Sequence, residues 1–264
     1  MIFYSNEPGL IQPEGIKRLD GTKDKNYKVP HIAVGVFSEY LLNDIVEKFE
    51  CEKVGHISCA NCQRPVYSMK YKKIKITLFL AGISGPWISA DIEELNTNGF
   101  DTFIIFENCG VLDKNIEDCS IIIPNMAFRD EGTSYHYLPD SESIELNRDF
   151  KDLFEEILKE NNYSFVEGAT WTTDGFFRET REKMEYFKSK GAICVEMEGA
   201  SIAAVCQYKN LKFFTFYYAA DNLDSDKWDE RSIEQLTNFS LKSKIPILAL
   251  ELARRIEEDE FKRK

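Results

Sequence analysis

Short apolar runs alternate with segments of helical periodicity along most of the chain. Residues 31–37 form an apolar run that predicts a buried strand, and residues 39–49 carry apolar side chains at helical spacing. Further strands are predicted at residues 74–81, 102–106, 120–123 and 213–220, with an irregular strand pair at 59–71. Further helices are predicted at residues 87–95, 148–160, 180–190 and 246–258. This alternation predicts a three-layer α/β fold, in which helices flank a twisted, mixed but mostly parallel central sheet.

Two residues are predicted to end the strands that precede them. Gly110 marks a turn after residues 102–106, and Pro124 closes residues 120–123. Residues 1–28 are polar and predict an extended N-terminal arm that packs on a neighbouring subunit. Residues 29–264 contain no convincing linker and predict a single domain.

Charge and hydropathy exclude several classes of partner. The formal net charge of −12 argues against binding to a nucleic-acid backbone. The chain has neither the run of about 18 apolar residues needed to span a membrane nor a basic segment followed by an apolar leader. We therefore expect a cytoplasmic protein with no membrane partner.

The chain contains seven cysteines, and several of them lie in apolar runs, as reduced core thiols do. Cys59 and Cys62 form a Cys-x-x-Cys pair, with Cys51 and His56 nearby, which resembles part of a zinc or redox site. A structural zinc site needs four ligands at recognisable spacing, and the sequence has no second Cys-x-x-Cys pair. We therefore expect no metal ion and no cofactor.

The stretch from Cys194 to Ser201 places two carboxylates beside a methionine at the start of a small and apolar run. A helix that is apolar on all sides is usually buried, and a buried glutamate needs a hydrogen-bonding or charged partner. Glu196 and Glu198 therefore require partners. The residues alone leave two interpretations open: a structural ion pair with a carboxylate at a helix start, or acids that hold a ligand.

Three segments resemble the nucleoside phosphorylase family. Residues 195–198 (Val-Glu-Met-Glu), followed by Gly and Ala, resemble the signature of the family. Residues 128–139 resemble a loop of its uridine phosphorylase-like branch, and residues 171–181 resemble the base-binding segment. The resemblance implies a catalytic domain of that fold, which cleaves the N-glycosidic bond of a purine or pyrimidine nucleoside. It also implies phosphorolysis, with inorganic phosphate as co-substrate and a pentose 1-phosphate as product.

The resemblance assigns the pentose site to the signature. Met197 is expected to pack under the ribose, and Glu198 to accept hydrogen bonds from its hydroxyls, with Glu196 beside them. Two neighbouring hydroxyls suit a carboxylate because it offers two oxygens, and charge-assisted bonds of this kind contribute about 1.5–3 kcal/mol each.

Base binding and proton donation fall to two other segments. By resemblance, Phe176 stacks on the base and Arg181 binds its polar edge, while Glu179 or Thr180 stands where uridine phosphorylases have a glutamine. Asp221 follows a predicted strand and is the expected general acid, because the leaving base gains electron density that a proton neutralises. A helix cap is the alternative role for this aspartate.

The phosphate-binding segments depart from the family pattern. Gly35 matches the first glycine, but Glu39 stands at the first arginine position and Ile105 at the second. Asn108 and the backbone N–H groups near Gly110 remain as donors to an anion.

Three routes remain open. Phosphate can bind through Arg129, backbone amides and Arg64, the last reaching in from a neighbouring subunit. Alternatively, Glu39 or Glu107 activates water, as a carboxylate does in the nucleosidases of the family. In the third route the protein binds a nucleoside without turnover. The resemblance also implies a homodimer, or a hexamer built as a trimer of dimers, whose neighbouring subunits complete the site.

Overall fold

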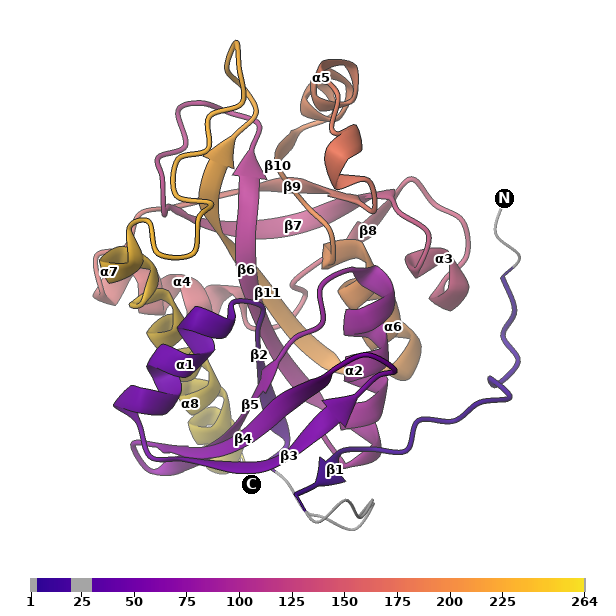
Figure 1. The fold of residues 1–264 in the computed structure, drawn as a ribbon, viewed down its shortest axis with the longest axis vertical. Coiled ribbons are helices and arrows are strands. Elements are labelled where there is room, and N and C mark those ends of the chain that lie inside the picture. The colour runs from indigo at the N-terminus through magenta and orange to yellow at the C-terminus, as the bar shows by residue number, and fades with distance from the viewer. Residues whose placement is uncertain (1–3, 20–29, 264) are drawn as a thin grey trace.

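The computed structural model describes residues 4–19 and 30–263 (Figure 1). The strands are β1 (Lys17–Arg18), β2 (Ile32–Val36), β3 (Cys51–Ser58), β4 (Gln63–Tyr71), β5 (Ile74–Leu80), β6 (Thr102–Val111), β7 (Ile121–Asp130), β8 (Ser143–Glu145), β9 (Phe165–Thr173), β10 (Ala192–Glu196) and β11 (Lys212–Asn222). The α-helices are α1 (Glu39–Lys48), α2 (Gly85–Thr97), α3 (Ser134–Tyr137), α4 (Lys151–Glu160), α5 (Arg181–Ser189), α6 (Gly199–Lys209), α7 (Phe239–Lys242) and α8 (Ile245–Arg263), with a short 3-10 turn η1 (Phe176–Arg178).

The strands form one mixed sheet whose central pairings are parallel. β2 runs parallel to β5 and β6, β6 runs parallel to β11, and β9 runs parallel to β7 and β10. β1, β3, β4 and β5 are antiparallel neighbours at one edge. Because β11 pairs with both β6 and β7, the strands β6, β10, β9, β7 and β11 close into a ring. The predicted α/β class with helices around a mixed sheet is confirmed.

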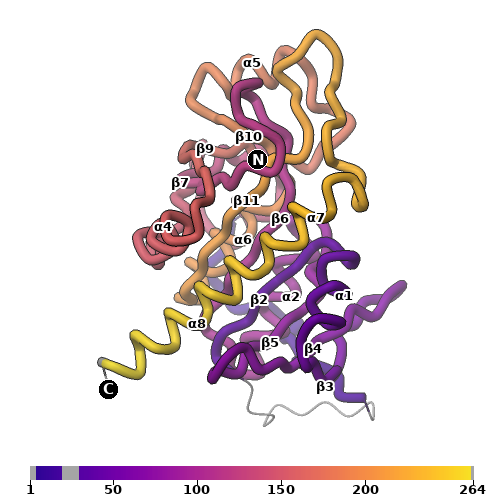
Figure 2. The backbone as a smooth tube through the Cα atoms, turned by 90° about the vertical axis from the view of Figure 1, so that its left-hand side faces the viewer, coloured from indigo at the N-terminus to yellow at the C-terminus, as the bar shows by residue number. Residues whose placement is uncertain are grey.

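β6 explains why the sheet carries helices on both faces. Ile104 and Phe106 belong to one buried cluster, while Phe103 and Ile105 belong to another, because successive side chains of a strand point to opposite faces. The first cluster includes side chains of α1, α4 and α8, and the second those of α2 and α6. Figure 2 shows α8 running across the face over β2 and β5.

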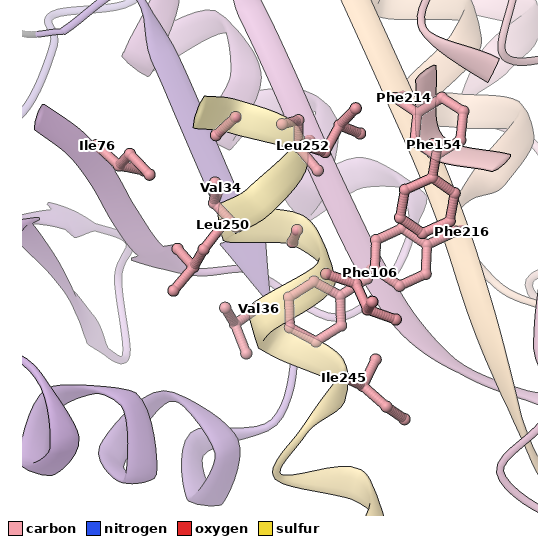
Figure 3. Close-up of a cluster of buried hydrophobic side chains, with 14 of the residues drawn as sticks. Val34, Val36, Ile76, Phe106, Phe154, Phe214, Phe216, Ile245, Leu250 and Leu252 are labelled. Carbon is pink, nitrogen blue, oxygen red and sulfur yellow. The ribbon is translucent and has the colours of Figure 1, made fainter. Parts of the chain in front are cut away.

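Aromatic packing fixes α4 against the sheet (Figure 3). The ring of Phe154 lies 4.9 Å from that of Phe214 and 4.5 Å from that of Phe216, measured between centroids. Each such side chain is fully buried and stabilises the fold by roughly 1.5–3 kcal/mol through burial. This packing holds β11, which carries Asp221 to the site.

Two predicted strand ends are wrong. β6 continues through Gly110, which pairs with Val195 of β10 and Asp221 of β11. β7 continues through Pro124, and a register shift between Pro124 and Met126 accommodates the N–H that proline lacks. The predicted irregular pair at 59–71 is the turn and the second strand of a hairpin that β3 and β4 form. No strand was predicted from the sequence where β9 and β10 lie.

The described part of the N-terminal arm lies along α2. The backbone N–H of Glu14 donates to Glu94 at 2.8 Å, and that of Ile16 donates to Asn98 at 2.7 Å. Residues 1–3 and 20–28 of the predicted arm lie outside the described residues, so its packing on a neighbour and the boundary at residue 29 stay predictions. Across the described ranges, no helix has the length and apolar character required to cross a bilayer.

Candidate active site

A cavity of about 220 Å³ lies where several strands of the sheet end. Its wall consists of residues that follow β2 and β5, the second half of β6, the ends of β10 and β11, and the turn after β9. Ligands of open α/β sheets bind beyond the carboxyl ends of the strands, and this cavity occupies that position.

Glu196, the last residue of β10, has both carboxyl oxygens filled by donors of its own chain. Its Oε1 accepts hydrogen bonds from the hydroxyls of Thr170 and Thr172, at 3.0 and 2.6 Å. Its Oε2 accepts the backbone N–H groups of Glu198, at 2.7 Å, and Gly199. A carboxylate accepts about four hydrogen bonds, so no position is left for a pentose hydroxyl. Contrary to expectation, Glu196 holds the turn between β10 and α6 rather than the sugar.

Glu198 retains the acceptor positions that Glu196 lacks. It is buried at the start of α6, where its Oε1 accepts the N–H of Ser84 and its Oε2 accepts the N–H of Met197, the latter at 3.1 Å. Each oxygen keeps a further acceptor position. Met197 lines the same wall, so this part of the cavity combines a methionine with a carboxylate that can accept further hydrogen bonds.

Glu107 of β6 lies against Glu198 and is 6% exposed. Its Oε1 receives no hydrogen bond from the described chain. A hydrogen bond between the carboxyl groups of Glu107 and Glu198 requires a proton on one of them, because two carboxylates offer no donor. Burial, and then the negative charges of Glu198 and Glu196, raise the pKa of Glu107 well above its usual value. Burial also raises the pKa of Glu198, but the hydrogen bonds it accepts from Glu107 and Ser84 oppose that effect. Glu107 therefore holds a proton more strongly than Glu198 does, because burial and two neighbouring negative charges act on it.

The same acids are the cluster that could hold a metal ion. Ligand atoms of Glu107, Glu196 and Glu198 lie within 4.8 Å of one another, and carboxylate oxygens suit Ca²⁺ or Mg²⁺. N–H and O–H donors already fill the oxygens of Glu196, and a proton bridges Glu107 and Glu198. The arrangement therefore favours a shared proton over a cation.

Two more acids, Asp221 and Glu179, line the cavity. Asp221 accepts a 2.7 Å hydrogen bond from Nε1 of Trp228, and burial raises the pKa of this aspartate against the effect of that bond. Burial and the charge of Asp221 raise the pKa of Glu179 to about 8. Both groups retain a proton more readily than exposed acids do, and both can donate it to a ring nitrogen. Phe176 also lines the cavity and is 43% exposed, which leaves its ring open to stacking.

Two of the predicted arginines are held elsewhere. The guanidinium of Arg129 donates to the hydroxyls of Ser134 and Ser141, both at 2.7 Å. Arg181 donates to the backbone carbonyl of Ser225. The structure therefore brings neither arginine into the cavity wall, and the expected contacts of Arg129 with phosphate and of Arg181 with the base stay predictions.

Three further residues from the predicted phosphate or water site also lie outside the cavity. Arg64 is buried in an ion pair with Asp91 of α2; its reach into a neighbouring subunit stays a prediction. Glu39 is exposed at the first turn of α1. A Cβ at Gly35 would lie 2.7 Å from the ring of Phe79, so this glycine serves strand packing.

The remaining predicted residues do line the cavity, although their roles stay predictions. They are Met197, Glu198, Glu196, Glu107, Phe176, Glu179, Asp221, Asn108 and Gly110. Phe37, Ser38 and Gln235 were not assigned a role from the sequence but also line it, with the Ser38 hydroxyl donating to Gln235 at 2.6 Å. The place of Ser38 after a predicted strand is a usable signal, whereas Gln235 lies in an irregular segment that offers none.

A family model described as "Phosphorylase superfamily" matches residues 31–247. The chain belongs to this superfamily. A guanosine phosphorylase of Halorubrum lacusprofundi is 26% identical over 156 residues, which are 58% of this chain and 63% of that relative. A 5'-methylthioadenosine/S-adenosylhomocysteine nucleosidase of Buchnera aphidicola is 26% identical over 198 residues, which are 70% of this chain and 80% of that relative.

The fold agrees with superfamily membership. The crystal structure of an AMP nucleosidase from Bacteroides thetaiotaomicron superposes with a TM-score of 0.70 and 17% identity, covering 87% of this chain and 90% of that one. The relatives of this superfamily member include phosphorylases and nucleosidases that act on nucleosides. Membership therefore leaves the acceptor of the pentose, phosphate or water, to be argued from the site.

Proposed function

We propose that this superfamily member hydrolyses the N-glycosidic bond of a purine nucleoside, with water as the acceptor. The absence of a cationic group from the cavity wall carries the proposal. Five acids line the cavity, Glu107, Glu179, Glu196, Glu198 and Asp221, and the described residues that line it include no lysine, arginine or histidine. A phosphate dianion would find no cationic side chain there and would lie near the carboxylate of Glu198 at reduced dielectric, whereas water is neutral. This reverses the order of the two routes that the resemblance implied.

Glu198 and Met197 would hold the pentose. The free acceptor positions on the two oxygens of Glu198 suit the 2'- and 3'-hydroxyls, and the thioether of Met197 packs against the apolar face of the ring. These bonds strengthen as positive charge develops on the pentose, because the carboxylate lies beside it. This differential binding is the part of the site that accelerates bond cleavage.

Asp221 would protonate the leaving base. When the bond between C1' and the base nitrogen breaks, its electron pair moves into the base, and the proton of Asp221 passes to N7. A purine offers N7 as the acceptor and a pyrimidine has no such atom, so two proton-donating acids, Asp221 and Glu179, favour a purine. The pKa of about 8 for Glu179 keeps that second donor protonated near neutral pH.

Glu107 would activate the water. Pentose hydroxyls that donate to Glu198 replace the proton that Glu107 supplies in the empty site, which frees Glu107 to ionise. A carboxylate with a raised pKa is a stronger base toward water than an ordinary glutamate. The water oxygen then bonds to C1' and its proton passes to Glu107, which gives free base and free pentose.

The deciding experiment is a panel of adenosine, guanosine and uridine, each with and without inorganic phosphate. We expect base and free pentose from a purine nucleoside at a rate that phosphate does not change. Phosphate-dependent formation of pentose 1-phosphate would establish phosphorolysis and refute the proposal. A thermal shift with nucleoside but no base release would indicate a binding protein.

The variant Glu107→Gln tests the assignment of the water-activating group. It keeps the shape of the side chain and removes the base, so we expect kcat to fall by about 10²–10⁴ with a normal thermal shift on nucleoside binding. Glu182→Gln, at an exposed glutamate in the first turn of α5, is the matched control. Equal loss in both variants, or none in Glu107→Gln, would remove Glu107 from the mechanism.

A further inference from the structure

Cys59 and Cys62 lie opposite each other in the turn between β3 and β4. The N–H of Cys59 donates to the carbonyl oxygen of Cys62 at 3.0 Å. Hydrogen-bonded antiparallel residues have Cα atoms about 5.5 Å apart, inside the range of about 4.4–6.8 Å that a disulfide spans. The two Sγ atoms are 3.1 Å apart and one thiol donates to the other. A bond between them therefore requires side-chain torsions to change and leaves the hairpin in place.

The surroundings make the two sulfurs unequal. The hydrogen bond from Cys62 lowers the pKa of the Cys59 thiol, and the same bond raises the pKa of the Cys62 thiol. Nη1 of Arg64 lies 3.9 Å from Sγ of Cys59 and 3.5 Å from Sγ of Cys62. A guanidinium at this distance stabilises a thiolate. The pair thus consists of two sulfurs in contact beside one guanidinium, both half-buried and within reach of solvent.

The other five cysteines offer no comparable site. Cys109, Cys194 and Cys206 are buried. Cys51 and Cys119 are half-buried, and burial raises the pKa of each thiol. Neither Cys51 nor Cys119 contacts another sulfur among the described residues, so these two cysteines serve as internal controls.

We propose that Cys59 and Cys62 form a thiol–disulfide exchange site for low-molecular-weight disulfides. The thiolate of one cysteine of the pair attacks one sulfur of the disulfide RSSR, whose S–S bond breaks and releases RS⁻. The thiolate of the other cysteine then attacks the protein sulfur of this mixed disulfide and releases the second RS⁻. Two protons and two electrons leave the protein, so one RSSR becomes two RSH and the hairpin gains one disulfide.

The experiment exposes the reduced full-length protein to oxidised glutathione, followed by acid quench, alkylation and mass spectrometry of the intact protein and its peptides. We expect a product that is lighter by two hydrogens, carries no glutathione and links Cys59 to Cys62. Cys51→Ser and Cys119→Ser should give the same product. A lasting glutathione adduct on the unaltered protein, a disulfide between other cysteines, or no reaction would overturn the proposal.

Two variants test whether both sulfurs are required. Cys62→Ser should stop at a glutathione adduct on Cys59, and Cys59→Ser at an adduct on Cys62, because no resolving thiol remains in either. A product free of glutathione from either variant would refute exchange within this pair. The readout is covalent and independent of nucleoside cleavage.

Discussion

Replacement of Glu198 by glutamine tests the pentose site most directly. The carboxylate oxygens already accept the backbone N–H groups of Ser84 and Met197, and each keeps one position that faces the cavity. Glutamine has nearly the same shape but only one acceptor oxygen. Its amide nitrogen is a donor and would face one of the two backbone N–H groups, which cannot accept a hydrogen bond. The variant therefore loses the negative charge and at least one of the two acceptor positions.

The expected loss follows from those two positions. Hydroxyl donors bound to a charged acceptor contribute about 1.5–3 kcal/mol each, so two of them contribute about 3–6 kcal/mol in the transition state. Since about 1.4 kcal/mol corresponds to a factor of ten in rate, Glu198→Gln should lower kcat/KM by about 10²–10⁴. The loss should appear mainly in kcat, because the carboxylate interacts most strongly with the positively charged pentose.

The assay compares a ribonucleoside with its 2'-deoxy analogue on the wild-type protein and on Glu198→Gln, with the base released followed by absorbance. On the wild-type protein the missing hydroxyl should lower kcat/KM, whereas on the variant it should have little further effect, since its acceptor is gone. Glu182→Gln is the control for a surface glutamate. A variant with wild-type turnover, or an unchanged penalty for the deoxy substrate, would refute the assignment of Glu198.

Three further predictions test the electrostatics and packing around the site. Trp228→Phe removes the N–H donor that lowers the pKa of Asp221, so the descending limb of kcat/KM against pH should move up by about one unit. Burial raises the pKa of Asp91 to about 6 and of Glu196 to about 7. Each raised pKa contributes stability that is full below the ordinary pKa of the acid and is lost as pH rises through 6 to 7. Tm should therefore fall by at least about 3 °C between pH 5 and pH 8.5; a Tm that rises over this interval would contradict this. Gly35→Ala brings a methyl group to 2.7 Å from a phenyl ring of β5, so denaturant titration should show destabilisation of about 1–3 kcal/mol, while a neutral result would reopen a direct role for Gly35 in the cavity.

The order of most strands and helices and the signature segment could be predicted from the sequence alone. The helix at residues 39–49 and the strand at 31–37 correspond to α1 and β2, because short-range periodicity decides whether a segment can bury one face. β9 escaped prediction because its run of threonines, Thr170, Thr172 and Thr173, is buried but polar. Two of these hydroxyls bind Glu196, and a sequence pattern does not reveal such a partner.

The predicted pentose residues Met197 and Glu198 line the cavity, but the predicted arginines do not. An arginine can be satisfied by any carboxylate or carbonyl that the fold brings near, as Arg64 is by Asp91 and Arg181 by Ser225. The sequence separation between such partners hides the pairing from any local pattern. For the same reason the sequence alone did not show where these arginine side chains lie.

The amino-acid sequence by itself determined the α/β class, the superfamily signature at residues 195–198 and the excess of negative charge. The tertiary structure decided which acids are already satisfied and which face a ligand. It brought Glu107 of β6 against Glu198, the residue that precedes α6, and it made Glu196 a support for the turn between β10 and α6. Local sterics and burial pattern set the elements, whereas hydrogen bonds between residues far apart in the chain set the chemistry of the cavity.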